Sequence, residues 1–327
     1  MNPVNYRECM KTALEGGKPN GVVPLWELHF HCWDQVTGEQ VIVGREFESL
    51  TASEKIKAIE KNANLMAEIA EKLHFAAVTI PDGYWETAPG VPSYYWLPGV
   101  ARCQLAEKLS KLIGDRIMIV AAVGGVMGMP GPSNYVDFCY QLADAPQKID
   151  EIARQTYSAG IETAKKMRDA GVEAVYTAGD LADNHGPFFK PEYMERFVLP
   201  YLRRWATEVK KMGLYAVLHT DGNINPILED LITSGIHALQ AIDPVAGMDV
   251  RKVKKLVDSR ICICGNLDCG LLFSGPEAVI YHTARDLLLD LKTDGAYVFG
   301  ASNAVHYETP LSHYLSMIRA WENHGNT

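Results

Sequence analysis

The chain has 327 residues, of which 47% are hydrophobic and 22% charged, and its formal net charge is −9. This composition is typical of a soluble globular protein, and the length suits one large barrel or two ordinary domains. The charge is spread along the chain without a basic stripe, which argues against nucleic acid and membranes as partners. The first residues lack the apolar core of a signal peptide, and the seven cysteines are an odd number. We therefore expect a cytoplasmic protein with reduced thiols.

Short apolar runs alternate along the chain with longer amphipathic stretches. The runs that we interpret as strands are residues 22–30, 75–80, 116–123, 173–177, 214–219, 237–243, 260–264 and 296–300. The main helical patterns cover residues 52–73, 146–170, 191–212 and 276–291. Eight strands separated by helices predict an α/β fold, a single (β/α)8 TIM barrel over residues 1–327 with an N-terminal extension. A doubly wound open sheet is the alternative, but no G-x-G-x-x-G follows the first strand.

The connection after the second predicted strand is long and rich in aromatic residues. Residues 82–99 contain five aromatics among prolines and glycines. Long connections of this kind are usually lids or binding loops. A small aromatic core that covers one end of the barrel is the alternative interpretation.

The fifth predicted strand ends in His219-Thr-Asp221, followed by the turn former Gly222. Two residues apart on an extended segment share one face, so His219 and Asp221 can converge on one ligand, metal or proton. A strand end capped by turn formers is the alternative.

Polar groups also follow most of the other strands, and the carboxyl ends of barrel strands are where such folds place their active sites. The candidates at these ends are Glu27, His29, His31, Asp82, Tyr84, Asp180, Asp183, Asn184, His185, Asp243, Asn266, Asp268, Ser302, Asn303 and His306. Each has a simpler explanation as a cap, a turn former or a buried hydrogen-bonded residue. Because six of the eight strands end in ionisable groups, we interpret the set as a polar ligand or catalytic pocket.

Several other chemistries are disfavoured by what the sequence lacks. It has no P-loop, no G-x-S-x-G elbow and no H-E-x-x-H motif, which argues against phosphoryl transfer on a P-loop and acyl hydrolysis. Cys262, Cys264 and Cys269 do not have the spacing of a structural zinc site, and buried cysteine is more often an apolar filler.

The C-terminal half resembles the uroporphyrinogen decarboxylase superfamily, most closely its corrinoid-dependent methyltransferases. The residues that carry the resemblance are His219-Thr-Asp221-Gly-Asn223, Ile242-Asp243-Pro244, Gly265-Asn266-Leu-Asp268, Gly300-Ala-Ser302-Asn303 and Thr309-Pro310. Two departures from the family matter. The segment Trp26–Trp33 lacks the arginines that grip porphyrin carboxylates in the decarboxylases. Asp221, and Ser302 or Asn303, replace the cysteines with which thiol-methylating relatives hold zinc.

The resemblance implies the first methyltransferase of a demethylase system. It would move a methyl group from a small methoxylated donor, an aromatic methyl ether in our interpretation, to the Co(I) corrinoid of a partner protein. His219, oriented by Asp221 or Asp243, is the expected catalytic centre, and the same three residues are the candidate zinc ligands. The expected substrate contacts are Glu27, His29, Asp82, Tyr84, Trp85, Asp180, Asp183, His185 and Asn303. Tyr84 and Trp85 offer rings for stacking.

Two other functions stay open. One is a decarboxylase or lyase acting on a small aromatic or heterocyclic acid, which needs no corrinoid partner. The other is a ligand-binding subunit without turnover. The resemblance also makes a homodimer plausible, although no isolated apolar helix face in the sequence demands one.

Overall fold

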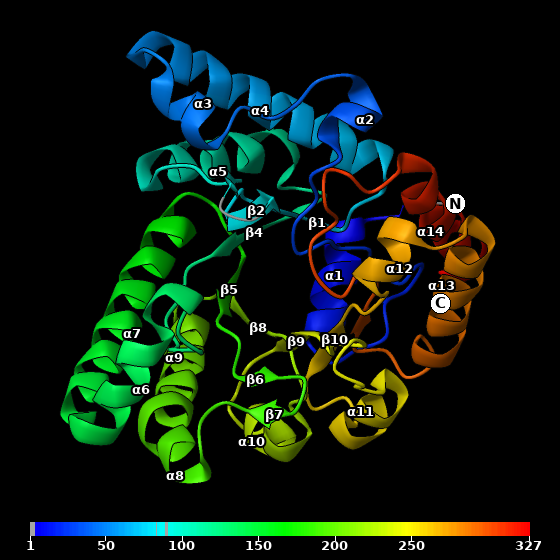
Figure 1. The fold of residues 1–327 in the computed structure, drawn as a ribbon. Coiled ribbons are helices and arrows are strands. Elements are labelled where there is room, and N and C mark those ends of the chain that lie inside the picture. The colour runs from blue at the N-terminus through cyan, green and yellow to red at the C-terminus, as the bar shows by residue number, and fades with distance from the viewer. Residues whose placement is uncertain (1–3, 83, 89–90) are drawn as a thin grey trace.

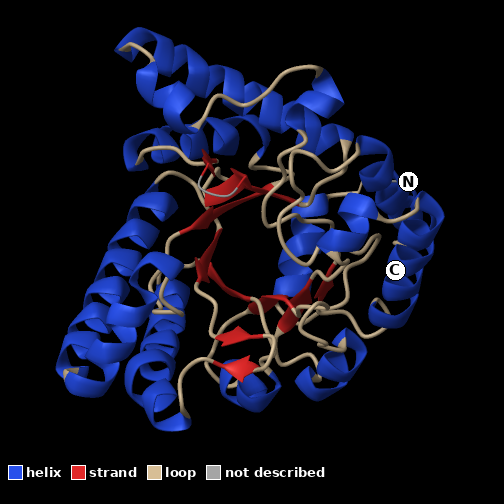
Figure 2. Ribbon diagram, viewed as in Figure 1, coloured by secondary structure: helices blue, strands red, loops and turns tan. Residues whose placement is uncertain are grey.

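The computed structural model describes residues 4–82, 84–88 and 91–327. Within these residues, seven parallel strands form one curled sheet with helices around its outside (Figure 1, Figure 2). The strands lie side by side in chain order: β1 (Ala77–Thr79), β4 (Met118–Ala122), β5 (Ala174–Ala178), β8 (Tyr215–Thr220), β9 (Ala238–Ala241), β10 (Cys262–Cys264) and β11 (Tyr297–Val298). This arrangement confirms the predicted α/β class, with a curled sheet of seven parallel strands in the described chain where the sequence predicts a closed barrel of eight.

The prediction of a regular strand over residues 22–30, the first of the eight, is wrong. The segment forms isolated bridges instead, including a parallel one between Leu25 and Phe299. Its backbone nevertheless joins the two edges of the sheet, because Leu25 O accepts from Ala76 N at 2.7 Å and Trp26 N donates to Phe299 O at 2.9 Å. Pro24 within the segment has no N–H to give to a ladder, which is one reason that regular pairing fails.

The helices of the described chain precede, connect and follow these strands. They are α1 (Tyr6–Leu14), α2 (Trp33–Thr37), α3 (Gly44–Ser49), α4 (Ala52–Lys72), α5 (Gly99–Ile113), α6 (Tyr135–Asp144), α7 (Pro146–Asp169), α8 (Pro191–Tyr193), α9 (Leu199–Lys211), α10 (Leu228–Ile232), α11 (Val250–Val257), α12 (Cys269–Ser274), α13 (Glu277–Leu291) and α14 (Leu311–His324). Short 3-10 turns cover Pro132–Asn134 and Asn225–Ile227. No helix in the described ranges is long and apolar enough to cross a membrane.

Local sequence signals explain where the long helices begin and where one of them is interrupted. Thr51 and Glu54 form a capping box at the start of α4, and Pro146 opens α7. The helix predicted over residues 191–212 is instead α8, a π-helical turn over Met194–Val198, and α9. Pro200, near the start of α9, removes a backbone donor, and a wider turn accommodates that loss.

Alternate residues of each strand point into the ring, where they form a core of their own. Met118 and Val120 belong to this inner cluster, whereas Ile119 and Ala121 belong to the outer core beneath the helices. Met10 and Leu14 of α1 also belong to the inner cluster. Helix α1 therefore closes the amino-terminal end of the ring, and the carboxyl ends of the strands form the other mouth.

Two antiparallel hairpins extend from this second mouth. Strands β2 (Tyr84–Ala88) and β3 (Val91–Tyr94) form one within the long connection after β1, and β6 (Ala182–Asp183) and β7 (Gly186–Pro187) form the other after β5. The aromatic-rich connection predicted to be a loop thus contains a hairpin and leads into α5.

Candidate active site

His219 faces the inside of the ring near its carboxyl-terminal mouth. Val217, two residues earlier on β8, belongs to the inner cluster, so the period of two turns His219 to the same side. The parallel register places His219 beside Gln240 of β9. Tyr176 of β5 faces the inside as well. Strand geometry alone therefore gathers these three side chains.

The buried amide of Gln240 fixes the protonation pattern of the His219 ring. Gln240 Nε2 donates to the carbonyl oxygens of Ser302 at 3.1 Å and Ala301 at 3.4 Å. A carbonyl can only accept, so this nitrogen is assigned from its partners, and Gln240 Oε1 faces His219 Nδ1 in a short hydrogen bond. An amide oxygen can only accept, so Nδ1 carries a proton. In the neutral ring, Nε2 then holds the lone pair.

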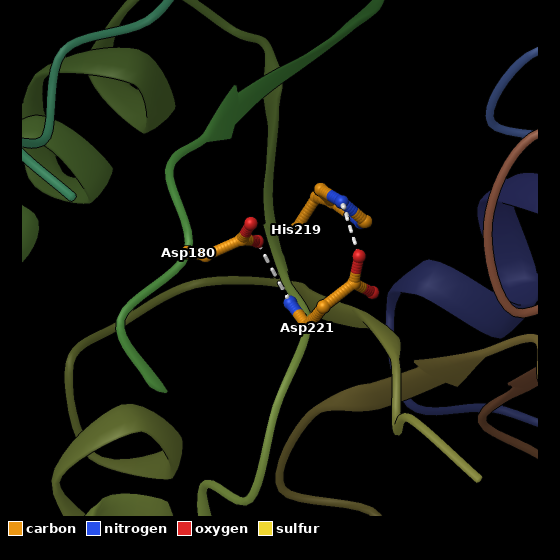
Figure 3. Close-up of side chains that lie close together, drawn as sticks. All are labelled: Asp180, His219 and Asp221. Atoms are coloured by element: carbon orange, nitrogen blue, oxygen red, sulfur yellow. Dashed lines mark hydrogen bonds and ion pairs between the residues drawn. The ribbon is translucent and has the colours of Figure 1, made fainter. Parts of the chain in front are cut away.

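Two carboxylates lie close to the His219 side chain. His219 Nε2 is 3.9 Å from Asp221 Oδ2, and Asp180 Oδ1 accepts the backbone N–H of Asp221 at 3.0 Å (Figure 3). Asp180 comes from the loop after β5, and His219 and Asp221 come from the end of β8. One donor atom from each of these three residues lies within 4.8 Å of the others. The structure thus places Asp180, one of the strand-end candidates, beside His219 and Asp221.

The pKa of Asp221 is raised to about 6. Burial is the largest cause, and the negative charges of Asp180 and Asp243 raise the pKa further, against the lowering effects of His219 and of a hydrogen bond from Asn303. Asn303 Nδ2 donates to Asp221 Oδ2 at 2.5 Å. A carboxyl group that titrates this close to neutrality can both give and take a proton under ordinary conditions.

The three residues fit a divalent cation, because the fold holds one atom of each and leaves another for a ligand. His219 is held at Nδ1, Asp180 at Oδ1 and Asp221 at Oδ2. Such outer contacts orient ligands in metal sites. One imidazole nitrogen and two carboxylates form a hard donor set without thiolate, compatible with zinc.

Asp243 does not belong to this group of three, and its predicted role beside His219 and Asp221 stays a prediction. Its Oδ2 accepts the backbone N–H of Gly222 at 3.1 Å, and its Oδ1 accepts that of Val245 at 2.9 Å. Both oxygens therefore hold loops, while the negative charge of Asp243 still raises the pKa of Asp221.

A second polar group lies further round the same mouth. His29 Nε2 and the Tyr176 hydroxyl are 3.1 Å apart, and Arg102 Nη2 is 3.2 Å from Asp82 Oδ2. Arg102 comes from α5 and also donates to Ala122 O at the end of β4. Burial, followed by the positive charges of His219 and Arg102, lowers the pKa of His29 to about 3. His29 is therefore neutral and lies within electrostatic reach of both groups.

Glu27 is buried in residues 22–30, the closing segment that joins the two edges of the sheet, and it holds this segment to its neighbours. Glu27 Oε2 accepts from Ala301 N at 2.9 Å, and Oε1 pairs with the Tyr314 hydroxyl at 3.0 Å. Burial raises its pKa to about 8, against the lowering effect of these two hydrogen bonds. These contacts explain Glu27 as part of the fold, whereas its predicted contact with substrate stays a prediction.

The remaining predicted substrate contacts are more scattered. Asp183 Oδ1 accepts the backbone N–H groups of His185 and Gly186, as a turn former does, and the His185 side chain is 95% exposed. Both lie on the β6–β7 hairpin. Tyr84 and Trp85 lie on β2, and their side chains fall outside the described part of the structure.

In the described chain, no cysteine belongs to the group formed by Asp180, His219 and Asp221. Cys262 and Cys264 are buried on β10 within the inner core. Cys269 Sγ accepts the backbone N–H of Asn303 at 3.2 Å, and burial raises its pKa to about 11. A neutral thiol that holds a loop is the role these contacts support.

Sequence reasoning missed Gln240, Tyr176 and Arg102. Gln240 had a detectable signal, because it is a polar residue in the middle of the apolar run His237–Asp243. Tyr176 had a weaker one, since tyrosine is common in strands. Arg102 had none, because an arginine on an amphipathic helix usually faces water.

The fold and the site define a barrel-like α/β protein with an acidic, histidine-containing mouth. The uroporphyrinogen decarboxylase (URO-D) family profile matches residues 110–324. The chain belongs to this family.

Individual relatives show how far the likeness extends. The chain is 27% identical to a uroporphyrinogen decarboxylase of Coxiella burnetii over 146 residues, which are 44% of this chain and 39% of that protein. It is 26% identical to that of Burkholderia thailandensis over 189 residues, 57% of this chain and 49% of the relative. The chain thus spans about two-fifths to one-half of the curated relatives it matches.

Solved structures extend the likeness in fold to the whole chain. A methyltransferase from Methanosarcina mazei superposes with a TM-score of 0.66 and 18% identity, covering 98% of this chain and 99% of that one. A putative vitamin-B12 independent methionine synthase from Listeria monocytogenes gives a TM-score of 0.53 and 14% identity, covering 93% and 99%. At such identities the likeness is one of fold.

Proposed function

We propose that the protein is a methyltransferase that moves a methyl group from a small methoxylated aromatic donor to the Co(I) corrinoid of a partner protein. The observation that carries the proposal is the convergence of Asp180, His219 and Asp221 at the mouth of the ring. This hard, oxygen-rich group suits the departure of an oxygen better than the activation of a thiol, which thiolate-bound zinc favours. The fold shared with a methyltransferase over nearly the full chain supports the same class.

The chemistry makes one demand on these residues. The methyl carbon is transferred to Co(I) as its bond to the donor oxygen breaks, and the electron pair stays on that oxygen. A phenol has a pKa of about 10, so the departing oxygen needs a proton or a positive charge beside it. A proton on His219 Nε2 or on the carboxyl group of Asp221 meets this demand, since Nδ1 is already committed to Gln240. Such general acid catalysis contributes roughly 10²–10⁴-fold.

Zinc is the other route to the same end, and Asp180, His219 and Asp221 are the residues that would hold it. A bound zinc ion supplies Lewis-acid stabilisation of negative charge on oxygen. In that case Gln240 and Asn303 keep the ligating side chains oriented.

The test is methyl transfer to free cob(I)alamin across a panel of methoxylated aromatics, with and without added zinc. His219→Ala should lower the rate by about 10² or more if His219 holds the proton or the metal. The matched control is His282→Ala, since His282 is an exposed histidine of α13. Unaltered transfer by His219→Ala would contradict the proposal.

A decarboxylase or lyase of a small aromatic acid is the second candidate, favoured by the family match itself. It predicts release of labelled carbon dioxide from a carboxylated aromatic substrate without any corrinoid. Release under those conditions, together with no methyl transfer, would replace the first proposal by the second.

A further inference from the structure

The Arg102 guanidinium has partners at Nη2 and, among the described residues, none at the buried Nε. Its Nη2 donates to Ala122 O and lies 3.2 Å from Asp82 Oδ2, whereas its buried Nε finds no hydrogen-bond partner in the structure as described. The Arg102 side chain is 11% exposed and that of Asp82 is 35% exposed. A buried donor without a partner costs about 1–3 kcal/mol, so this edge favours any ligand that supplies an acceptor.

The edge formed by Nε and Nη2 has the geometry that a carboxylate fills. Nε and Nη2 lie on one side of the planar guanidinium and together bind both oxygens of a carboxylate. Asp82 already shows that a carboxylate can reach Nη2, but it makes a single contact from a partly exposed side chain. A ligand that engages both nitrogens can therefore displace it.

This edge lies at the same mouth as His219. Ala122 ends β4, and β5 alone separates β4 from β8, which carries His219. The ends of β4 and β8 are therefore two strand spacings apart, which corresponds to ~10 Å. The hydrogen-bonded pair of His29 and Tyr176 lies between, since Tyr176 is on β5.

We infer that Arg102 binds an acidic substituent of the methyl donor, on the opposite side of its ring from the methoxy group. This inference rests on the proposed function, because it takes His219 as the position of the methyl-bearing oxygen. A single ring with a methoxy group and a carboxylate at opposite positions bridges the two strand ends, whereas neighbouring substituents are too close together to do so.

Equilibrium binding tests the inference without any turnover. The probes are 4-methoxybenzoate, its neutral amide 4-methoxybenzamide, and 2-methoxybenzoate, titrated by calorimetry. Wild-type protein should bind 4-methoxybenzoate at least tenfold more tightly than the other two. Arg102→Met should weaken the binding of 4-methoxybenzoate by about 10–100-fold, as expected for the loss of charge-assisted hydrogen bonds. It should change the affinity for the amide by less than about threefold.

Asp82→Asn gives a change of opposite sign. It removes the competing carboxylate, so the affinity for 4-methoxybenzoate should rise severalfold while that for the amide stays the same. A purely structural pair predicts that both variants weaken both ligands. Arg7→Met is the matched control, because Arg7 forms a comparable partly buried ion pair with Glu173 before β5, at the other end of the ring.

The outcomes separate this inference from the proposed function. Equal losses for acid and amide in Arg102→Met, weaker binding of the acid by Asp82→Asn, or no binding of 4-methoxybenzoate to the wild type would each overturn it. Charge-selective binding without methyl transfer would keep the Arg102 subsite and contradict the methyltransferase.

Discussion

At the scale of single residues, Gln240 has the largest influence on what His219 can do. Its amide oxygen accepts from Nδ1 because its nitrogen is committed to Ser302 and Ala301. The ring therefore presents Nε2 to the ligand side, where a metal or a proton can bind. His219 and Asp221 were predictable from spacing, but this tautomer depends on Gln240, 21 positions from His219, and on Ala301 and Ser302, which are 61 and 62 positions from Gln240.

Replacing Gln240 by methionine should release the ring while keeping the volume of the side chain. We expect methyl transfer to fall by about 10–100-fold, as for other outer contacts of ligating histidines. Two-bond ¹H–¹⁵N NMR of His219 should show Nδ1–H in the wild type and a mixture of tautomers in Gln240→Met. A wild-type ring protonated at Nε2 instead would contradict the assignment.

Glu27 should make the stability of the protein depend on pH. Its pKa is about 8 in the folded chain and near 4.5 ordinarily, so between these values the unfolded chain has released a proton that the folded chain retains. The free energy of unfolding therefore falls as the pH rises through this window, by up to 1.4 kcal/mol per pH unit, or on the order of a few kcal/mol in all.

Glu27→Gln mimics the protonated acid and should remove this slope. Urea denaturation at pH 5, 6.5 and 8 measures it. The variant should gain stability relative to the wild type as the pH rises, whereas Glu48→Gln, at an exposed position of α3, should follow the wild type. Parallel curves for wild type and Glu27→Gln would show that Glu27 is ionised in the folded protein.

At the scale of elements, the turn after β8 positions both Asp221 and the start of the next helix. Gly222 has a φ of +87°, and a Cβ there would lie 2.3 Å from Ala182 O. The turn was predictable from the Asp-Gly pair. Its close approach to the β6–β7 hairpin was not, because that hairpin comes from a segment 40 residues earlier.

Gly222→Ala should therefore cost more than the left-handed backbone alone. We expect a loss of roughly 3–4 kcal/mol, of which the backbone conformation accounts for about 1–2 kcal/mol. Gly213→Ala is the control, since Gly213 has a φ of +78° and nothing within 4 Å of its added Cβ. Equal losses of unfolding free energy for Gly222→Ala and Gly213→Ala in denaturant melts would show that the β6–β7 hairpin moves away freely.

At the scale of the whole molecule, closure of the ring depends on an irregular segment and a glycine. Gly300 lies against the closing segment, where a Cβ would be 2.1 Å from Trp26 O and 3.3 Å from Glu27 Oε2. The same region supplies Ala301 N to Glu27 and Ala301 O to Gln240. Closure and the orientation of His219 are therefore linked through residues 300–302.

Gly300→Ala should separate the closing segment from β11. We expect a destabilisation of roughly 2–4 kcal/mol, typical of overpacking against backbone, together with reduced binding of methoxylated ligands. Gly99→Ala, at the exposed start of α5 with open space around it, should be neutral or slightly stabilising. Unchanged thermal unfolding of Gly300→Ala would show that the segment does not close the ring tightly.

The sequence by itself determined the alternation of strands and helices, the parallel α/β class and the pair His219 and Asp221, because these depend on local periodicity and on spacing along one strand. It predicted a regular strand over residues 22–30 where only isolated bridges form, because apolar content does not reveal that a segment will pair only at single positions. Tertiary structure alone decided that Asp180 joins the pair, because Asp180 comes from a separate loop and is held there by the backbone N–H of Asp221. It also placed Arg102 at the mouth, since the direction of a helix face is set by packing between distant segments.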